Sequence, residues 1–139
     1  SGKVLTLDSK EGYEEVMGFF QEAADAAESK PDTVKLYFAS APVLHVELMS
    51  KIISKIEGLP FRQVVFFLRD HNFLKILKNK KIWNFFTENV DHEKGKVYVY
   101  VSKELYFHTK WYAYKLDGTG RVQIMCTSAN MISSHSKKV

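Results

Sequence analysis

The chain contains a single cysteine and no long run of apolar residues. Cys126 cannot form an internal disulfide, which favours a reducing compartment, so we expect an intracellular location, cytoplasmic or nuclear. No window approaches the roughly 18 continuous apolar residues that a transmembrane helix needs, and we therefore expect no transmembrane segment. A charged fraction of 26% beside a hydrophobic fraction of 45% also excludes a disordered chain.

The composition of the chain is that of a folded domain. The 139 residues, of which 14% are aromatic, suffice for one hydrophobic core, so we expect a single domain over residues 1–139. The opening Ser1-Gly2 is typical of a cloning scar, and we expect a domain excised or truncated from a longer parent chain with further domains. Twenty Lys and Arg residues against sixteen acidic ones favour a polyanionic partner such as nucleic acid.

Hydrophobic periodicity and turn residues divide the chain into alternating helices and strands. Helices are expected over 9–29, 43–56 and 73–88, the last as one helix or two short ones after a turn at 70–72. Strands are expected over 34–39, 62–68, 96–101, 106–116 and 121–130. The 62–68 segment is continuously apolar, which is typical of a strand covered on both faces. This order predicts an α/β domain with a mixed, mostly parallel β-sheet flanked by helices on both faces.

Four polar residues in the last two expected strands form the main candidate site. His108 and Lys110 are two residues apart, as are Ser128 and Asn130, so each pair projects from one face of its strand. The connecting loop has the composition of a hairpin turn. A turn centred on Thr119 would pair His108 with Asn130 and Lys110 with Ser128, and all four side chains would converge on one patch.

This patch suits a phosphodiester. Lys110 supplies a positive charge, and Ser128 and Asn130 supply neutral donors for oxygens whose charge must be stabilised as phosphorus becomes five-coordinate. His108 could act as nucleophile when neutral or as general acid when charged. One histidine cannot do both in the same step, so the chain contains half of such a site.

The H-x-K followed by S-x-N resembles the signature of the phospholipase D (HKD) superfamily, in a single-motif, nuclease-like half domain. The resemblance extends to the α-β-α-β-α order before the motif and covers residues 8–130. It implies a phospholipase D-like fold, a phosphohistidine intermediate, no metal or other cofactor, and a homodimer that supplies the second histidine. It also implies that Lys110 and Asn130 bind the phosphoryl oxygens, that Ser128 supports them, and that His108 is nucleophile or acid.

Two departures from the family pattern affect the interpretation. The family's usual aspartate, five residues after the lysine, is here Lys115, and Asp117 two residues later is either a supporting residue or a turn residue. This departure argues against a lipid substrate more than against catalysis. The chain also ends nine residues after Asn130, where the family continues, so the domain is either trimmed or reduced, with activity lost in the second case.

Other residues have both a functional and a structural interpretation. Lysines in the 73–88 region could follow a phosphate backbone or form a solvated helix face; they are Lys75, Lys78, Lys80 and Lys81. Aromatic residues in the 106–116 strand could stack on bases, but core packing is the more common role; they are Trp111, Tyr112 and Tyr114. Cys126 is expected in the core. The remaining histidines lack metal-ligand spacing; they are His45, His71, His92 and His135.

Two functions follow. The first is a metal-independent phosphodiesterase, a nuclease that acts on single-stranded RNA or DNA through a two-histidine site in a homodimer. The second is a catalytically inactive domain of the same fold that dimerises, or binds RNA or protein, within a larger protein.

Overall fold

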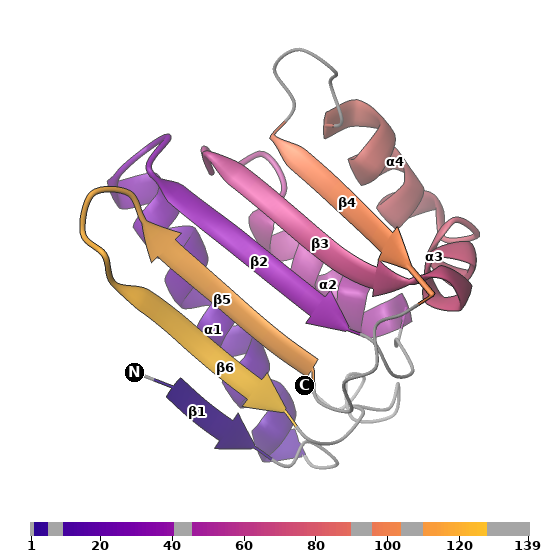
Figure 1. Ribbon diagram of the computed structural model, residues 1–139, viewed down its shortest axis with the longest axis horizontal. Helices are drawn as coiled ribbons and strands as arrows, with labels where there is room; N and C mark the ends of the chain where they lie inside the picture. Colours follow the sequence, from indigo (N-terminus) through magenta and orange to yellow (C-terminus); the bar gives the residue numbers. More distant parts are fainter. Residues whose placement is uncertain (1, 6–9, 41–45, 90–95, 104–109, 128–139) are drawn as a thin grey trace.

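The computed structural model describes residues 2–5, 10–40, 46–89, 96–103 and 110–127 (Figure 1). Six strands form one sheet in the order β1-β6-β5-β2-β3-β4. The strands are β1 (Gly2–Leu5), β2 (Val34–Ser40), β3 (Gln63–Arg69), β4 (Val97–Ser102), β5 (Lys110–Leu116) and β6 (Val122–Thr127). The helices are α1 (Lys10–Ser29), α2 (Val46–Ile56), α3 (Asp70–Ile76) and α4 (Lys80–Asn89).

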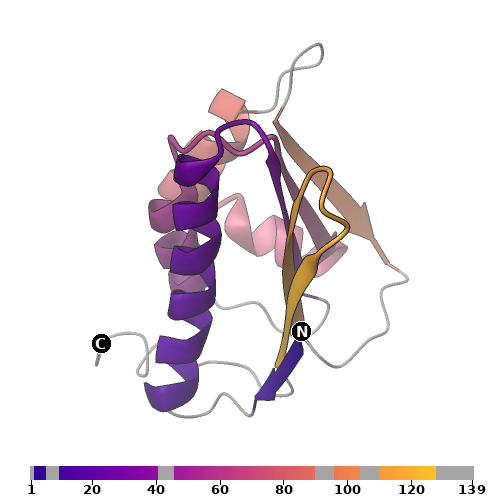
Figure 2. The ribbon, with the colours of Figure 1, turned by 90° about the vertical axis from the view of Figure 1, so that its left-hand side faces the viewer.

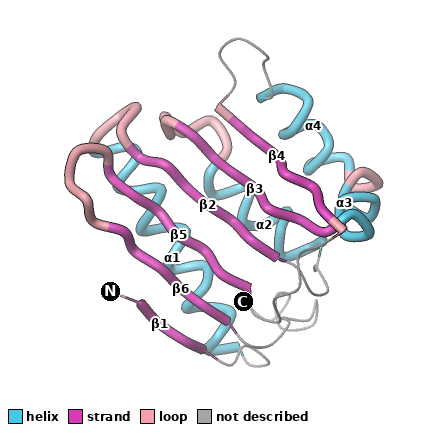
Figure 3. Tube along the Cα trace, viewed as in Figure 1, coloured by secondary structure: helices cyan, strands magenta, loops and turns pink. Residues whose placement is uncertain are grey.

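The sheet is mixed and mostly parallel. β5 is antiparallel to both of its neighbours, β2 and β6, whereas every other pair of adjacent strands is parallel. Five strands therefore end at the edge where β5 begins (Figure 3). The predicted α/β class and the mixed, mostly parallel sheet are confirmed, whereas β1 was not expected from the sequence.

The helices bury apolar residues that recur at helical spacing. In α1, Val16, Phe20, Ala23 and Ala27 have no exposed surface, and α2 buries Ile52 and Ile53 in the same way. The predicted end of the 43–56 helix is confirmed, because α2 ends at Ile56; Gly58 follows with a positive φ of 74°, which favours glycine. None of the described helices is long and apolar enough to cross a membrane.

All four described helices lie on one face of the sheet, and none covers the other (Figure 2). The predicted helices on both faces are therefore wrong for the described part of the chain. On the covered face, Leu36, Phe38 and Phe66 are at most 2% exposed. The opposite face, which we call the open face, carries Tyr37 and Phe67, both only partly buried.

The predicted turn at 70–72 is also wrong, because α3 begins at Asp70, directly after β3. The 73–88 region is two helices, which was one of the predicted alternatives. The break has a local cause: the Asn79 side-chain Oδ1 accepts a hydrogen bond from the backbone N–H of Ile82 at 3.0 Å. This contact caps the start of α4 and ends the preceding turn.

Candidate functional site at the carboxyl edge of the sheet

Lys110 is the described member of the predicted active-site cluster, and it lies at the edge of the sheet where the other strands end. It is the first residue of β5 and is in register with Ser40 at the end of β2 and with Thr127 at the end of β6. We call this edge the carboxyl edge. In open α/β sheets, ligands bind outside the carboxyl ends of the parallel strands. The topology thus places Lys110 where such folds bind ligands.

The environment of Lys110 differs from that of an ordinary surface lysine. Lys110 alternates with Tyr112 and Tyr114 on the covered face and is 2% exposed. Desolvation by burial lowers the pKa of its amine from 10.5 to about 8. A bound anion would favour the charged amine and offset this cost, as a phosphate-binding lysine requires.

The hairpin register differs by one residue from the prediction. Lys110 pairs with Thr127, and Trp111 pairs with Cys126, so the predicted pairing of Lys110 with Ser128 is wrong. The cause is the turn: the numbers of paired residues sum to 237, so the turn is centred between Gly118 and Thr119 and not on Thr119. The Thr119 hydroxyl donates a hydrogen bond to the Leu116 carbonyl at 2.9 Å and accepts one from the Arg121 N–H at 3.2 Å.

His108, Ser128 and Asn130 lie outside the described residues. Their convergence with Lys110 therefore stays a prediction. In the sequence, residue 108 comes two positions before Lys110, and residue 128 directly follows Thr127. Lys110 and Thr127 are register partners, so β5 begins and β6 ends at neighbouring positions on the carboxyl edge.

Asp117, the possible supporting residue, lies at the other end of β5. Seven residues of extended strand separate it from Lys110, a distance of about 24 Å at a rise of about 3.4 Å per residue. Its carboxylate is 2.9 Å from the Arg62 guanidinium and 3.8 Å from the Lys35 ammonium. Asp117 therefore cannot contact Lys110, and its contacts are those of a residue that stabilises the hairpin loop.

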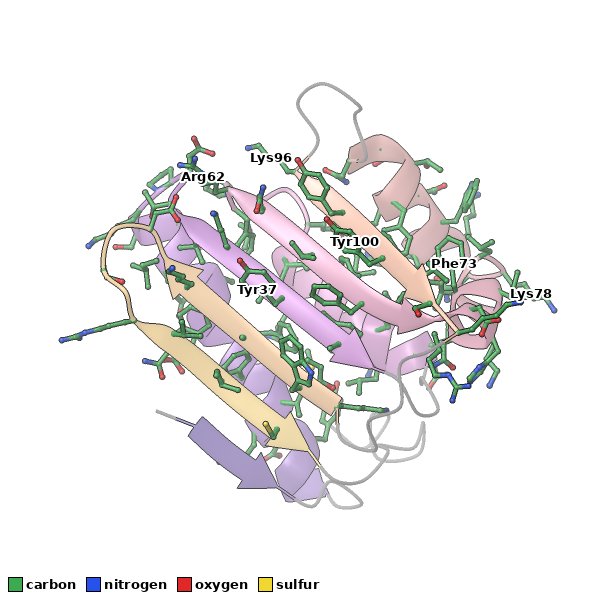
Figure 4. The ribbon with its side chains drawn as sticks, viewed as in Figure 1. Tyr37, Arg62, Phe73, Lys78, Lys96 and Tyr100 are labelled. Carbon is green, nitrogen blue, oxygen red and sulfur yellow. The ribbon has the colours of Figure 1, made fainter. Side chains whose placement is uncertain are left out.

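The three lysines predicted to bind substrate do not form a common anion site. Lys81 donates a hydrogen bond to Glu57 at 2.9 Å. Lys80 and Lys81 line a depression of about 520 Å³ that also contains Glu57 and Glu88, so its charge is mixed. Lys78 is exposed beyond the end of α3 (Figure 4). These contacts favour the interpretation as a solvated helix face.

The aromatic residues of β5 divide between the two faces. Tyr112 and Tyr114 are 1% and 4% exposed, and the Tyr114 hydroxyl donates a hydrogen bond to Glu22 at 2.6 Å, so core packing is confirmed for both. Trp111 lies on the open face, where its ring is 6.1 Å from that of Phe67. Cys126, expected in the core, is in register with Trp111 and is only partly buried.

The exposed aromatic rings of the open face were not predicted from the sequence. Two of its most exposed rings belong to Tyr98 and Tyr100 of β4, at 40% and 57% exposure. The signal was present in the Val-Tyr-Val-Tyr-Val sequence of β4, whose alternation is typical of a strand covered on one face. β3 does not show this alternation, because both of its faces are apolar.

Comparison of the chain with known protein families, with curated protein sequences and with solved structures finds no match. Within the described ranges, no group of three or more His, Cys, Asp or Glu residues could hold a metal ion. The described histidine, His71, is exposed in α3, where its ring lies 3.8 Å from Asp70.

Proposed function

We propose that this protein is a metal-independent phosphodiesterase, a nuclease that cleaves single-stranded nucleic acid through a site at the carboxyl edge of the sheet. The observation that carries the proposal is Lys110, a buried lysine at the edge where α/β sheets bind ligands, with His108 two residues before it in the sequence. The resemblance of the His108, Lys110, Ser128 and Asn130 motif to the phospholipase D superfamily supports the same reaction, and a phospholipase D-like fold with it.

In the proposed reaction, the neutral imidazole of His108 attacks phosphorus and forms a bond from nitrogen to phosphorus. The bond to the leaving oxygen breaks, and that oxygen takes a proton from the His108 imidazolium of a second subunit. Water then attacks the phosphohistidine, with the second imidazole accepting its proton, and restores both histidines. Lys110 and Asn130 stabilise the charge on the non-bridging oxygens, and Ser128 supports them.

A homodimer follows from this chemistry, because each chain contributes one His108. The two-fold axis would pass between the carboxyl edges of the two subunits. A chain that is strictly monomeric in solution could not assemble the two-histidine site, so sedimentation measurements at the concentration used for activity test this part of the proposal.

The decisive test is cleavage of labelled single-stranded RNA and DNA in EDTA by the wild type, by His108→Ala and by His71→Ala. We expect cleavage that survives chelation, that is lost in His108→Ala, and that is unchanged in His71→Ala, which removes an exposed histidine of α3. Oligonucleotide binding without cleavage by the wild type would contradict catalysis and favour the non-catalytic binding domain.

A further inference from the structure

The open face of the sheet carries a continuous strip of aromatic rings. The register aligns Trp111 of β5, Phe67 of β3 and Tyr100 of β4 in one row, with the small Ala39 of β2 between Trp111 and Phe67. The rings of Phe67 and Tyr100 are stacked, with centroids 5.3 Å apart and planes inclined by 14°. Trp111 extends the strip on the other side of Phe67.

A second row lies beside this strip and encloses a depression. Tyr37, Val65 and Tyr98 are in register, and with Gln63, Phe67 and Tyr100 they line a hollow of about 420 Å³. This volume falls within the range of about 300–1,000 Å³ typical of small-molecule sites. Tyr37 and Tyr100 are on the same side of the sheet in Figure 4. Flat rings and a few polar groups suit a planar heterocycle.

The charged residues at the open-face positions of the strands are positive, and an acidic group beside them is Asp117, which follows β5 and lies 3.8 Å from the Lys35 ammonium. The polar positions of the open face in β2 to β6 hold Lys35, Gln63, Arg69, Ser102, Lys115 and Cys126, and no described position on this face of these strands is acidic. The acidic residues are concentrated on the other side. Helix α1 has six acidic residues against one lysine, which leaves nineteen of the twenty Lys and Arg residues but ten of the sixteen acidic ones for the rest of the chain.

We propose that the open face binds single-stranded nucleic acid, with bases stacked on Tyr98 and Tyr100 and in the depression beside Tyr37. Lys35 and Lys115 contact the phosphates. Exposed rings within a positively charged surface are the combination that single-strand binding uses, because every base has a face that can stack on an aromatic ring. The inference deepens the proposed function, on which it rests for the class of substrate, by naming a binding surface apart from Lys110.

The test measures binding of short labelled oligouridylate and oligothymidylate by fluorescence anisotropy in the His108→Ala background, so that cleavage cannot consume the probe. Tyr100→Leu and Tyr98→Leu keep apolar volume but remove the ring, and each should raise Kd about fivefold or more. Tyr100→Phe keeps the ring and should stay within about twofold of the parent. Trp83→Leu, which removes a ring 46% exposed on α4, is the matched control and should leave Kd unchanged.

Unchanged affinity in the Tyr98→Leu and Tyr100→Leu double variant would overturn the inference, as would equal affinity for duplex and single strand. It would also be overturned if the double variant lost self-association while still binding the probe, because the face would then be an interface between copies. If cleavage required His108 but binding did not depend on Tyr98 and Tyr100, the proposed nuclease function would be supported and the open-face binding surface would be rejected. Ring-dependent binding without cleavage would support the surface and reject the nuclease.

Discussion

The two faces of the sheet come from the same strands, yet they differ in how far their aromatic rings are exposed. On the covered face, Phe38, Phe66 and Tyr112 are at most 2% exposed. On the open face, Tyr98 and Tyr100 are 40% and 57% exposed, and a tyrosine ring has a hydroxyl that water can solvate. The difference teaches that one face provides stability, while the other can remain accessible to a ligand.

The largest effect on stability is expected when Phe66, on the covered face, is replaced, and it should exceed the effect of replacing its neighbour Phe67 on the open face. The Phe66 ring packs against Phe38, Phe85 and Phe86, with centroids 5.2 to 6.2 Å away. Phe66→Ala should lower the free energy of unfolding by about 3–5 kcal/mol, because it leaves a cavity in the core. Phe67→Ala, on the open face, should lower it by less than about 2 kcal/mol.

Urea unfolding monitored by circular dichroism measures both variants, and the unfolding slopes must agree for the comparison to hold. Equal losses would mean that Phe67 is as fully packed in solution as Phe66. The distinction between a covered and an open face would then be wrong.

The next largest effect is expected when Lys110, whose ionisable side chain lies on the covered face, is replaced. Lys110→Met should stabilise the protein at pH 7 by roughly 1–3 kcal/mol, because it removes a buried amine that is costly to charge. The same variant should lose cleavage. A substitution that stabilises the fold but removes activity is typical of a functional site, where stability is traded for chemistry.

The lowered pKa of Lys110 makes the free energy of unfolding depend on pH. The folded pKa of about 8 lies below the ordinary 10.5, so between these values the unfolded chain binds more protons. Wild-type stability should therefore rise with pH in this window relative to Lys110→Met. Burial raises the pKa of Tyr114, helped by its hydrogen bond to Glu22, and stability from that source is lost only above about pH 10. Urea unfolding between pH 7 and 9.5 measures the contribution of Lys110 to the free energy of unfolding, below the pH range in which Tyr114 contributes. If Lys110→Met were less stable than the wild type, other groups in the fold would have to stabilise the Lys110 ammonium.

The order of most elements could be predicted because periodicity and turn residues act locally. The coverage of the sheet could not be predicted, because β3 has apolar residues on both faces and its composition is the same whether a second layer packs on it or not. The break between α3 and α4 had a readable signal in Asn79, whose side chain caps the second helix.

The two strands and the hairpin that hold the candidate site were predictable, but the pairing of their residues was not. The sequence correctly indicated a strand that contains Lys110 and a hairpin that returns beside it. The facing residue depended on where the turn is centred, and a register shift of one residue changes every pairing. Asp117 was interpreted either as a supporting residue or as a turn residue; an extended strand carries it to the opposite edge from Lys110, where it is a turn residue.

The smallest effect is expected from Asp117→Asn, which tests the charge difference between the two faces. Asp117 holds Lys35 of the open face and Arg62, and these groups are partly exposed. Asp117→Asn should therefore cost only a few tenths of a kcal/mol in the free energy of unfolding. By releasing Lys35, it should also lower Kd for the labelled single strand by about twofold, with a steeper dependence on salt.

Glu57→Gln is the matched control for Asp117→Asn. It also removes one carboxylate, which here forms the ion pair between Glu57 and Lys81 next to α2 and α4 on the covered side. Net charge changes equally in the two variants, so a general attraction to the polyanion would lower Kd in both. A decrease confined to Asp117→Asn would instead require the nucleic acid to pass close to Lys35 or Arg62. Because both variants keep every aromatic ring, this pair tests the electrostatic half of the open-face proposal separately from its stacking half.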